Sequence, residues 1–173
     1  MTLAADLLEQ ARTLAKREPK RPRQASLRRA VSSAYYALFH QLTEAASRDL
    51  ITGTDCEILR NQVRRAFKHT EMKEVCHALA KWQPKQPPLR LAGLFAQSPS
   101  QDIQCVASAF VELQQARHDA DYDALYRFSR DDVLTLVETA EQAFSIFNGL
   151  PRKNTERRNL LVALAFYKRW QQA

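Results

Sequence analysis

The chain has 173 residues, of which 45% are hydrophobic and 26% are charged. This length and composition suit one soluble domain with a buried core. Its 26 basic and 19 acidic residues give a formal net charge of +7, which is compatible with nucleic-acid binding and also occurs in proteins that bind none. The three cysteines form no CxxC pair, so neither a disulfide framework nor a zinc ribbon is predicted. We expect a reducing cytoplasm, with no signal peptide and no membrane-spanning segment.

The apolar residues recur at helical spacing, and only three glycines interrupt them. The first helix is predicted over residues 2–18, where a proline ends it. The second is predicted over 26–50, and a third from residue 54 or 55 to about 82, before a proline-rich stretch. No segment alternates in the way a strand would.

A short apolar turn is expected over residues 89–95, and the next helix is predicted to begin at Ser98 and Pro99. Ser129 and Asp132 resemble a capping box at the start of the following helix. The last segment begins with basic residues and has an apolar face, comprising Leu160, Leu161, Leu164, Ala165 and Trp170.

These patterns predict an all-α, up-and-down bundle of about five or six helices. The bundle is expected over residues 1–150. The basic C-terminal helix, 151–173, is expected to dock on the bundle or on a partner.

Arg117 is the main anomaly in the apolar pattern. It falls on the same helical face as the preceding apolar residues, which are Ile103, Val106, Phe110 and Leu113. A buried, unpaired guanidinium would be costly, and Asp121 is placed four residues on, where it can form an ion pair. Together with Tyr122, this pair forms either a polar cleft or a structural cluster.

Two stretches together resemble the HEPN superfamily of small α-helical domains. YYALFH, which contains Tyr35 and Tyr36, is similar to the paired-aromatic signature of one HEPN branch. R-x-x-A-D-Y, which contains Arg117, Asp121 and Tyr122, is similar to a second signature of that branch.

The resemblance covers roughly residues 3–148, and it implies a four- or five-helix bundle that commonly dimerises. Many HEPN members are metal-independent ribonucleases, often toxins or defence proteins, and others are non-catalytic partners of nucleotidyltransferases. The resemblance therefore implies a homodimer, with RNA or a nucleotidyltransferase as a possible partner.

Catalytic members carry an R-x4-6-H motif, in which arginine holds phosphate and imidazole acts as acid or base. Arg117 is followed directly by His118, so this spacing is absent there. Arg64 and His69 have the required spacing and are the candidate catalytic pair. The alternative is a solvated basic face that happens to include a histidine.

A basic stripe on the predicted third helix could contact nucleic acid, or it could simply be solvated. Its residues are Arg60, Arg64, Arg65 and Lys68. Neither a metal nor a cofactor is expected, because His69, Cys76 and His77 do not make a four-ligand zinc pattern and no phosphate-binding glycine loop is present.

Two functions follow from these patterns. The first is a HEPN-like, non-catalytic interaction module, in a toxin–antitoxin or defence system. The alternative is a metal-independent HEPN-type ribonuclease or RNA-binding protein that acts as a dimer. The sequence leaves it open whether the protein is an enzyme.

Overall fold

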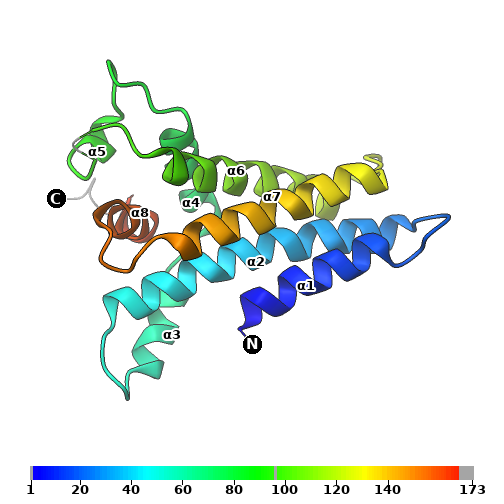
Figure 1. The fold of residues 1–173 in the computed structure, drawn as a ribbon, viewed down its shortest axis with the longest axis horizontal. Helices are drawn as coiled ribbons and strands as arrows, with labels where there is room; N and C mark the ends of the chain where they lie inside the picture. Colours follow the sequence, from blue (N-terminus) through cyan, green and yellow to red (C-terminus); the bar gives the residue numbers. More distant parts are fainter. Residues whose placement is uncertain (1, 96, 168–173) are drawn as a thin grey trace. The chain divides into compact units, whose positions relative to one another are not determined.

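The computed structural model describes residues 2–95 and 97–167, and within these ranges every regular element is helical (Figure 1). The prediction of an all-α protein is thus confirmed. The described ranges contain the helices α1 (Leu3–Lys16), α2 (Gln24–Leu50), α3 (Glu57–Arg65), α4 (His69–Ala80), α5 (Leu89–Ala92), α6 (Gln101–Tyr122), α7 (Arg130–Gly149) and α8 (Thr155–Phe166). None of them is both long and apolar enough to cross a membrane.

The prediction of one long third helix is wrong, because the chain forms α3 and α4 with a break between them. Lys68 has an extended backbone, with ψ of 129°. The apolar residues explain the break. Helical steps onward from Ala66 would reach Thr70 and Lys73, whereas α4 buries Met72, Val75, Cys76 and Leu79. A straight helix continued from Ala66 would therefore present Thr70 and Lys73, and not these buried α4 residues, on the side of Ala66.

Contacts divide the chain into two compact units. Unit 1 contains the described residues of Met1–Gln41 and Ala109–Ser145, and unit 2 contains those of Leu42–Ser108 and Ile146–Ala173. Helices α2, α6 and α7 each contribute residues to both units.

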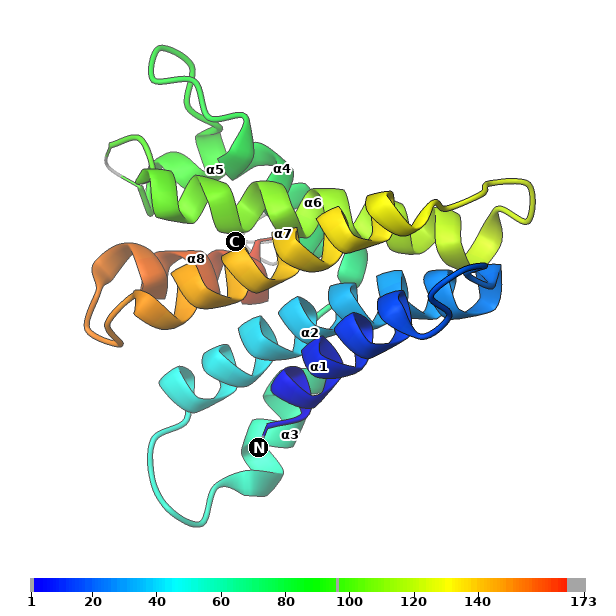
Figure 2. The ribbon, with the colours of Figure 1, turned by 45° about the vertical axis from the view of Figure 1, so that its right-hand side comes forward.

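In unit 1, α1 and the first part of α2 run antiparallel and side by side (Figures 1 and 2). The Ser26 hydroxyl donates to Glu18 at 2.9 Å, and the Ser33 hydroxyl donates to Gln10 at 3.0 Å. As the position along α2 increases, its partner lies earlier in the chain, which is the order that two antiparallel segments produce. Glu18 accepts bonds from Ser26 and Arg23, and although its partial burial opposes ionisation, these bonds hold its pKa below the usual value.

Helices α2 and α7 run in the same direction. The Gln24 side chain forms two hydrogen bonds with the backbone of Phe128, just before α7. Near the end of this part of α2, the Gln41 amide donates to the Phe144 carbonyl at 3.0 Å. With α1 and α6 running the opposite way, unit 1 is an up-and-down four-helix arrangement. Its fully or nearly fully buried side chains include Ala11, Leu27, Val31, Ala34, Tyr35, Leu38, Phe110, Leu113, Val133 and Val137.

The predicted capping box at the start of α7 is confirmed. The Ser129 N–H donates to the Asp132 carboxylate at 3.1 Å, and the Asp132 N–H donates back to the Ser129 hydroxyl oxygen at 3.1 Å. The Ser129 hydroxyl also donates to the carboxylate, at 2.6 Å. The hydrogen bond from the Ser129 side chain holds the pKa of Asp132 below its usual value. The short range of these bonds, three residues, is why the sequence alone could predict them.

Unit 2 contains α3, α4, α5 and α8, and α4 packs against α8. Asn154 caps α8 by accepting a hydrogen bond from the Arg157 N–H at 2.8 Å. The apolar face predicted for the C-terminal segment is buried at Leu160, Leu161 and Leu164. Trp170, which we also expected on that face, lies outside the described residues.

Arg157 is buried in unit 2 and holds the end of α7. Its Nη1 donates to the carbonyls of Phe147 and Leu150 at 3.3 and 3.2 Å, and its Nε lies 3.3 Å from the Asp49 carboxylate. The exposed Arg152 also pairs with Asp49, at 2.8 Å. Asp49 thus joins one buried and one exposed arginine.

We predict that Asp49→Ala lowers the free energy of unfolding by about 3 kcal/mol, because it leaves the buried Arg157 without a countercharge. Arg152→Ala is the matched control. Its side chain is 66% exposed, and the loss should stay below about 1 kcal/mol. Urea denaturation measures both values, and equal losses for the two variants would contradict this account.

Candidate functional site

Polar side chains at four-residue steps along α2 face the last turns of α6 within unit 1. On α2 these are Arg28, Ser32 and Tyr36, and their partners on α6 include Arg117 and Asp121. Four-residue spacing keeps side chains on one face of a helix. We call these five residues the polar ladder.

Arg117 lies at the centre of the polar ladder and is mostly buried. Its Nη2 donates to the Tyr36 hydroxyl at 3.0 Å, and its Nε lies 2.6 Å from an Asp121 carboxylate oxygen. The Nε has no well-directed hydrogen bond, so the contact with Asp121 acts through charge. The guanidinium carbon lies 5.5 Å from the ring centroids of both Tyr36 and Tyr122, within cation–π range.

The groups around Arg117 stabilise its positive charge. Burial opposes the charged form, but the neighbouring Tyr36 and Asp121 outweigh it, so the pKa of the guanidinium is raised above its ordinary value. Asp121 accepts a second bond, from the Ser32 hydroxyl at 2.8 Å. These contacts link side chains of α2 to side chains of α6 within unit 1.

The structure separates the two tyrosines of YYALFH. Tyr35 is fully buried and packs against Phe110, with ring centroids 5.5 Å apart. Tyr36 points its hydroxyl to Arg117 and lies near His40, with ring centroids 6.2 Å apart. Only Tyr36 therefore belongs to the polar ladder.

Arg28 closes the C-terminal end of α6, which has no basic residue of its own in the last turn. Its guanidinium donates to four backbone carbonyls, those of Asp119, Ala120, Asp123 and Tyr126, at 3.3, 2.7, 2.7 and 2.5 Å. The Asp119 carbonyl also accepts a hydrogen bond from the Asp123 N–H at 3.1 Å. The last carbonyls of a helix otherwise lack partners within the helix, and Arg28 supplies donors there. Arg28 and Ser32 were not predicted as part of this polar cluster, although their four-residue spacing to Tyr36 was a usable signal.

Contacts within the loop that follows α6 also order it. Asp123 accepts hydrogen bonds from the N–H groups of Leu125 and Tyr126 at 2.9 and 3.1 Å. The Tyr126 ring packs against the Phe128 ring in a tilted orientation, with centroids 4.7 Å apart. On this fixed backbone, Leu125 is 89% exposed, and Tyr122 and Tyr126 are also exposed. We call residues 122–126 the tyrosine loop.

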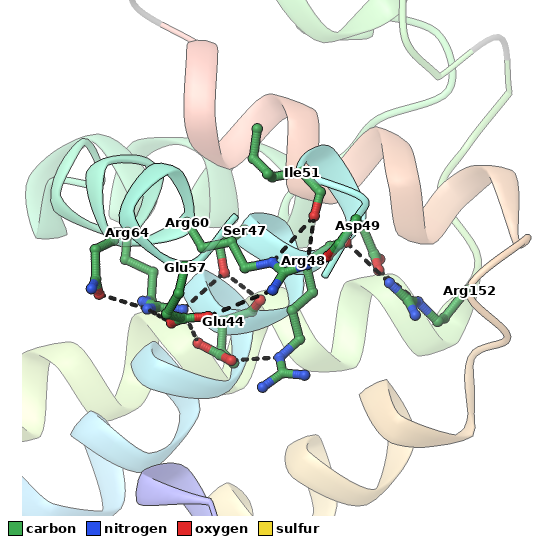
Figure 3. Close-up of polar contacts among 11 residues, drawn as sticks. Glu44, Ser47, Arg48, Asp49, Ile51, Glu57, Arg60, Arg64 and Arg152 are labelled. Atoms are coloured by element: carbon green, nitrogen blue, oxygen red, sulfur yellow. Dashed lines mark hydrogen bonds and ion pairs between the residues drawn. The ribbon is translucent and has the colours of Figure 1, made fainter. Parts of the chain in front are cut away.

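Arg64 lies in a network that joins α3 to the end of α2, which Figure 3 shows. It pairs with Glu44 at 2.6 Å and with Glu57 at 2.5 Å. The hydrogen bond from Arg64 holds the pKa of Glu57 below its usual value. His69 is the first residue of α4, so the helical spacing that suggested a pair with Arg64 does not exist.

The other residues of the predicted basic stripe differ in their surroundings. Arg60 donates to the Ile51 carbonyl at 3.2 Å and to the Gly53 carbonyl at 2.6 Å. Lys68 pairs with Glu71 at 3.2 Å, and Arg65 is exposed. The structure does not bring these cations together into a single surface.

Among the described residues, no three His, Cys, Asp or Glu side chains converge in a way that could hold a metal ion. Cys76 is fully buried, and burial raises the pKa of its thiol. A thiol that stays protonated is a poor nucleophile, so Cys76 is a packing residue of α4.

Comparison with known proteins found no matching family model, curated protein or solved structure.

We predict that Arg28→Ala loosens the tyrosine loop, because four carbonyls lose the hydrogen bonds from the guanidinium. Hydrogen–deuterium exchange should become faster in residues 119–126 by roughly tenfold or more, which corresponds to a local loss of about 1.4 kcal/mol. Arg29→Ala is the matched control, since its side chain is exposed. Unchanged exchange in Arg28→Ala would contradict the role assigned to this residue.

Proposed function

We propose that this chain is a non-catalytic, HEPN-like interaction module that binds a partner protein through the tyrosine loop. The observation that carries the proposal is that loop itself. Tyr122, Leu125 and Tyr126 are exposed, while Arg28 and Asp123 hold the backbone that presents them.

Exposed aromatic side chains on a fixed backbone are well suited to protein recognition. Tyrosine and arginine are enriched among the residues that dominate binding energy. Because the loop is already ordered by Arg28, little conformational entropy is lost when a partner binds. Arg117, which stacks on Tyr122, also limits the freedom of that ring.

The HEPN resemblance supports a cytoplasmic toxin–antitoxin or defence setting. It also supports a nucleotidyltransferase as the partner. In this proposal the polar ladder has a structural task, which is to fix the end of α6 and so to place the tyrosine loop.

The competing function is a metal-independent ribonuclease or RNA-binding protein. It needs Arg64 to hold phosphate and His69 to transfer a proton. The geometry favours the interaction module, because Arg64 is already paired with Glu44 and Glu57. A phosphate would have to displace one of these carboxylates.

We predict that Arg117→Ala lowers the free energy of unfolding by about 2 kcal/mol, since Asp121 and Tyr36 lose a charged partner. The corresponding fall in Tm is several degrees, and the exposed Arg127→Ala is the control. The purified protein should leave single-stranded RNA intact without added metal. Cleavage that disappears in His69→Ala would instead establish the ribonuclease.

We predict that a photoreactive phenylalanine analogue at position 125 forms a covalent adduct with one partner protein in cells. The same analogue at position 3 is the control, because Leu3 is also exposed and belongs to the same unit. Tyr126→Ala should reduce the adduct at position 125. No adduct there, or equal adducts at both positions, would contradict the proposal.

A further inference from the structure

The segment between α1 and α2 in unit 1 concentrates positive charge on the surface. It comprises residues 17–23, and we call it the basic connector. Its cations are all exposed, and they are Arg17, Lys20, Arg21 and Arg23. The only carboxylate among these residues is that of Glu18. Because like charges this close together repel one another, the basic connector is a place where an anionic group would be stabilised.

Glu18 does not neutralise this cluster. Its side chain is only 18% exposed, and it accepts hydrogen bonds from the Ser26 hydroxyl at 2.9 Å and from the Arg23 Nε at 3.0 Å. Within the part of the chain that the structure describes, Lys20 and Arg21 form no ion pair. These two exposed cations therefore have no countercharge of their own.

The backbone of the basic connector is held in place by Arg130, the first residue of α7. Its Nη1 donates to the Pro19 carbonyl at 2.6 Å, and its Nη2 donates to the Glu18 carbonyl. Arg130 thus brings a further positive charge against the connector. Pro19 and Pro22 also restrict the backbone, because a proline ring fixes φ. Cations on a backbone that is already ordered lose little conformational entropy when they bind.

The basic connector lies beside the tyrosine loop. Figures 1 and 2 show the connector and the loop between α6 and α7 at the same end of unit 1. Gln24, which follows the connector directly, forms two hydrogen bonds with the backbone of Phe128. One turn farther along α2, Arg28 donates to the Tyr126 carbonyl. A protein that covers the tyrosine loop can therefore also reach the connector.

We propose that the partner protein of the tyrosine loop carries a segment rich in Asp and Glu, which binds the basic connector. This proposal rests on the proposed function and adds the chemistry of the partner. Carboxylates of the partner pair with Lys20 and Arg21, while an apolar pocket next to them covers Leu125. Exposed charges at the edge of an apolar contact mainly speed association and select the correct partner.

The charges near the tyrosine loop favour a protein over nucleic acid or an anionic lipid surface. Asp123 and Asp131 are exposed there, with the exposed Arg127 between them in the sequence. A phosphate backbone or a layer of anionic headgroups that covered both surfaces would meet these carboxylates with charge of the same sign. A folded protein can place carboxylates over the connector and neutral or cationic groups over the loop.

Charge reversal on the full chain tests the proposal, with the photoreactive analogue at position 125. Lys20→Glu with Arg21→Glu should reduce the adduct roughly tenfold, because like charges then face each other. Lys81→Glu with Lys85→Glu is the matched control. It changes the net charge equally, and both lysines are exposed in unit 2, so the adduct should stay unchanged. Both double variants should keep the circular dichroism of the wild type.

A second position for the analogue locates the acidic segment. Ala25 is exposed in the first turn of α2, directly after the connector. The adduct at position 25 should contain the same protein as the adduct at position 125, joined through a peptide rich in Asp and Glu. Changing these acidic residues of the partner to Lys should restore the adduct of the Lys20→Glu, Arg21→Glu variant.

The outcomes separate this proposal from the proposed function. An adduct at position 125 that the charge reversal leaves unchanged would overturn the acidic segment alone, whereas absence of that adduct would overturn the proposed function as well. Attachment at position 25 to a peptide without acidic residues would also contradict the proposal. In a cell lysate the adduct should survive nuclease and detergent. Its loss under either treatment would identify nucleic acid or a lipid surface as the ligand of the connector.

Discussion

Arginines donate to carbonyls at helix ends or just beyond them, and the arrangement of both units depends on this interaction. The last carbonyls of a helix have no partner within the helix. Arg28 supplies donors to the end of α6 and Arg157 to the end of α7. Arg60 does so beyond α2, and Arg130 donates to the carbonyls of residues that follow α1. Guanidinium suits this task, because it offers five donors in a fixed plane.

Because these arginines bond within the chain, the positive net charge is a poor guide to how much cationic surface a ligand can reach. From composition alone, +7 is compatible with a surface that binds nucleic acid. Arg28 and Arg60 are instead directed at backbone carbonyls, and Arg64 is directed at two carboxylates. A count of cations therefore overstates the positive surface that is available to a ligand.

The ordered polar contacts also account for the two places where apolar side chains meet solvent. Arg28 fixes the backbone of the tyrosine loop and so exposes Leu125. Arg60 and Arg64 fix α3 and so expose Ile58. In both cases polar bonds of arginine side chains hold the backbone, and apolar side chains on it are exposed. The tyrosine loop is the surface that carries the proposed function.

The sequence by itself determined the features that depend on residues a few positions apart. Helical spacing predicted most of the helices, and the three-residue spacing of Ser129 and Asp132 predicted the cap of α7, which the structure contains. The four-residue spacing of Arg117 and Asp121 likewise placed them within reach of each other. Such interactions lie within one turn of helix, so their geometry follows from helical periodicity.

Only the tertiary structure decided the features that join distant residues. Arg28 reaches carbonyls more than 90 positions away, and Tyr36 rather than Tyr35 meets Arg117. After the break that follows α3, α4 buries Met72, Val75, Cys76 and Leu79, whereas α3 buries no residue. Helical periodicity gives the face on which a residue lies, but the packing of other helices decides whether that face is buried, bonded or left to solvent.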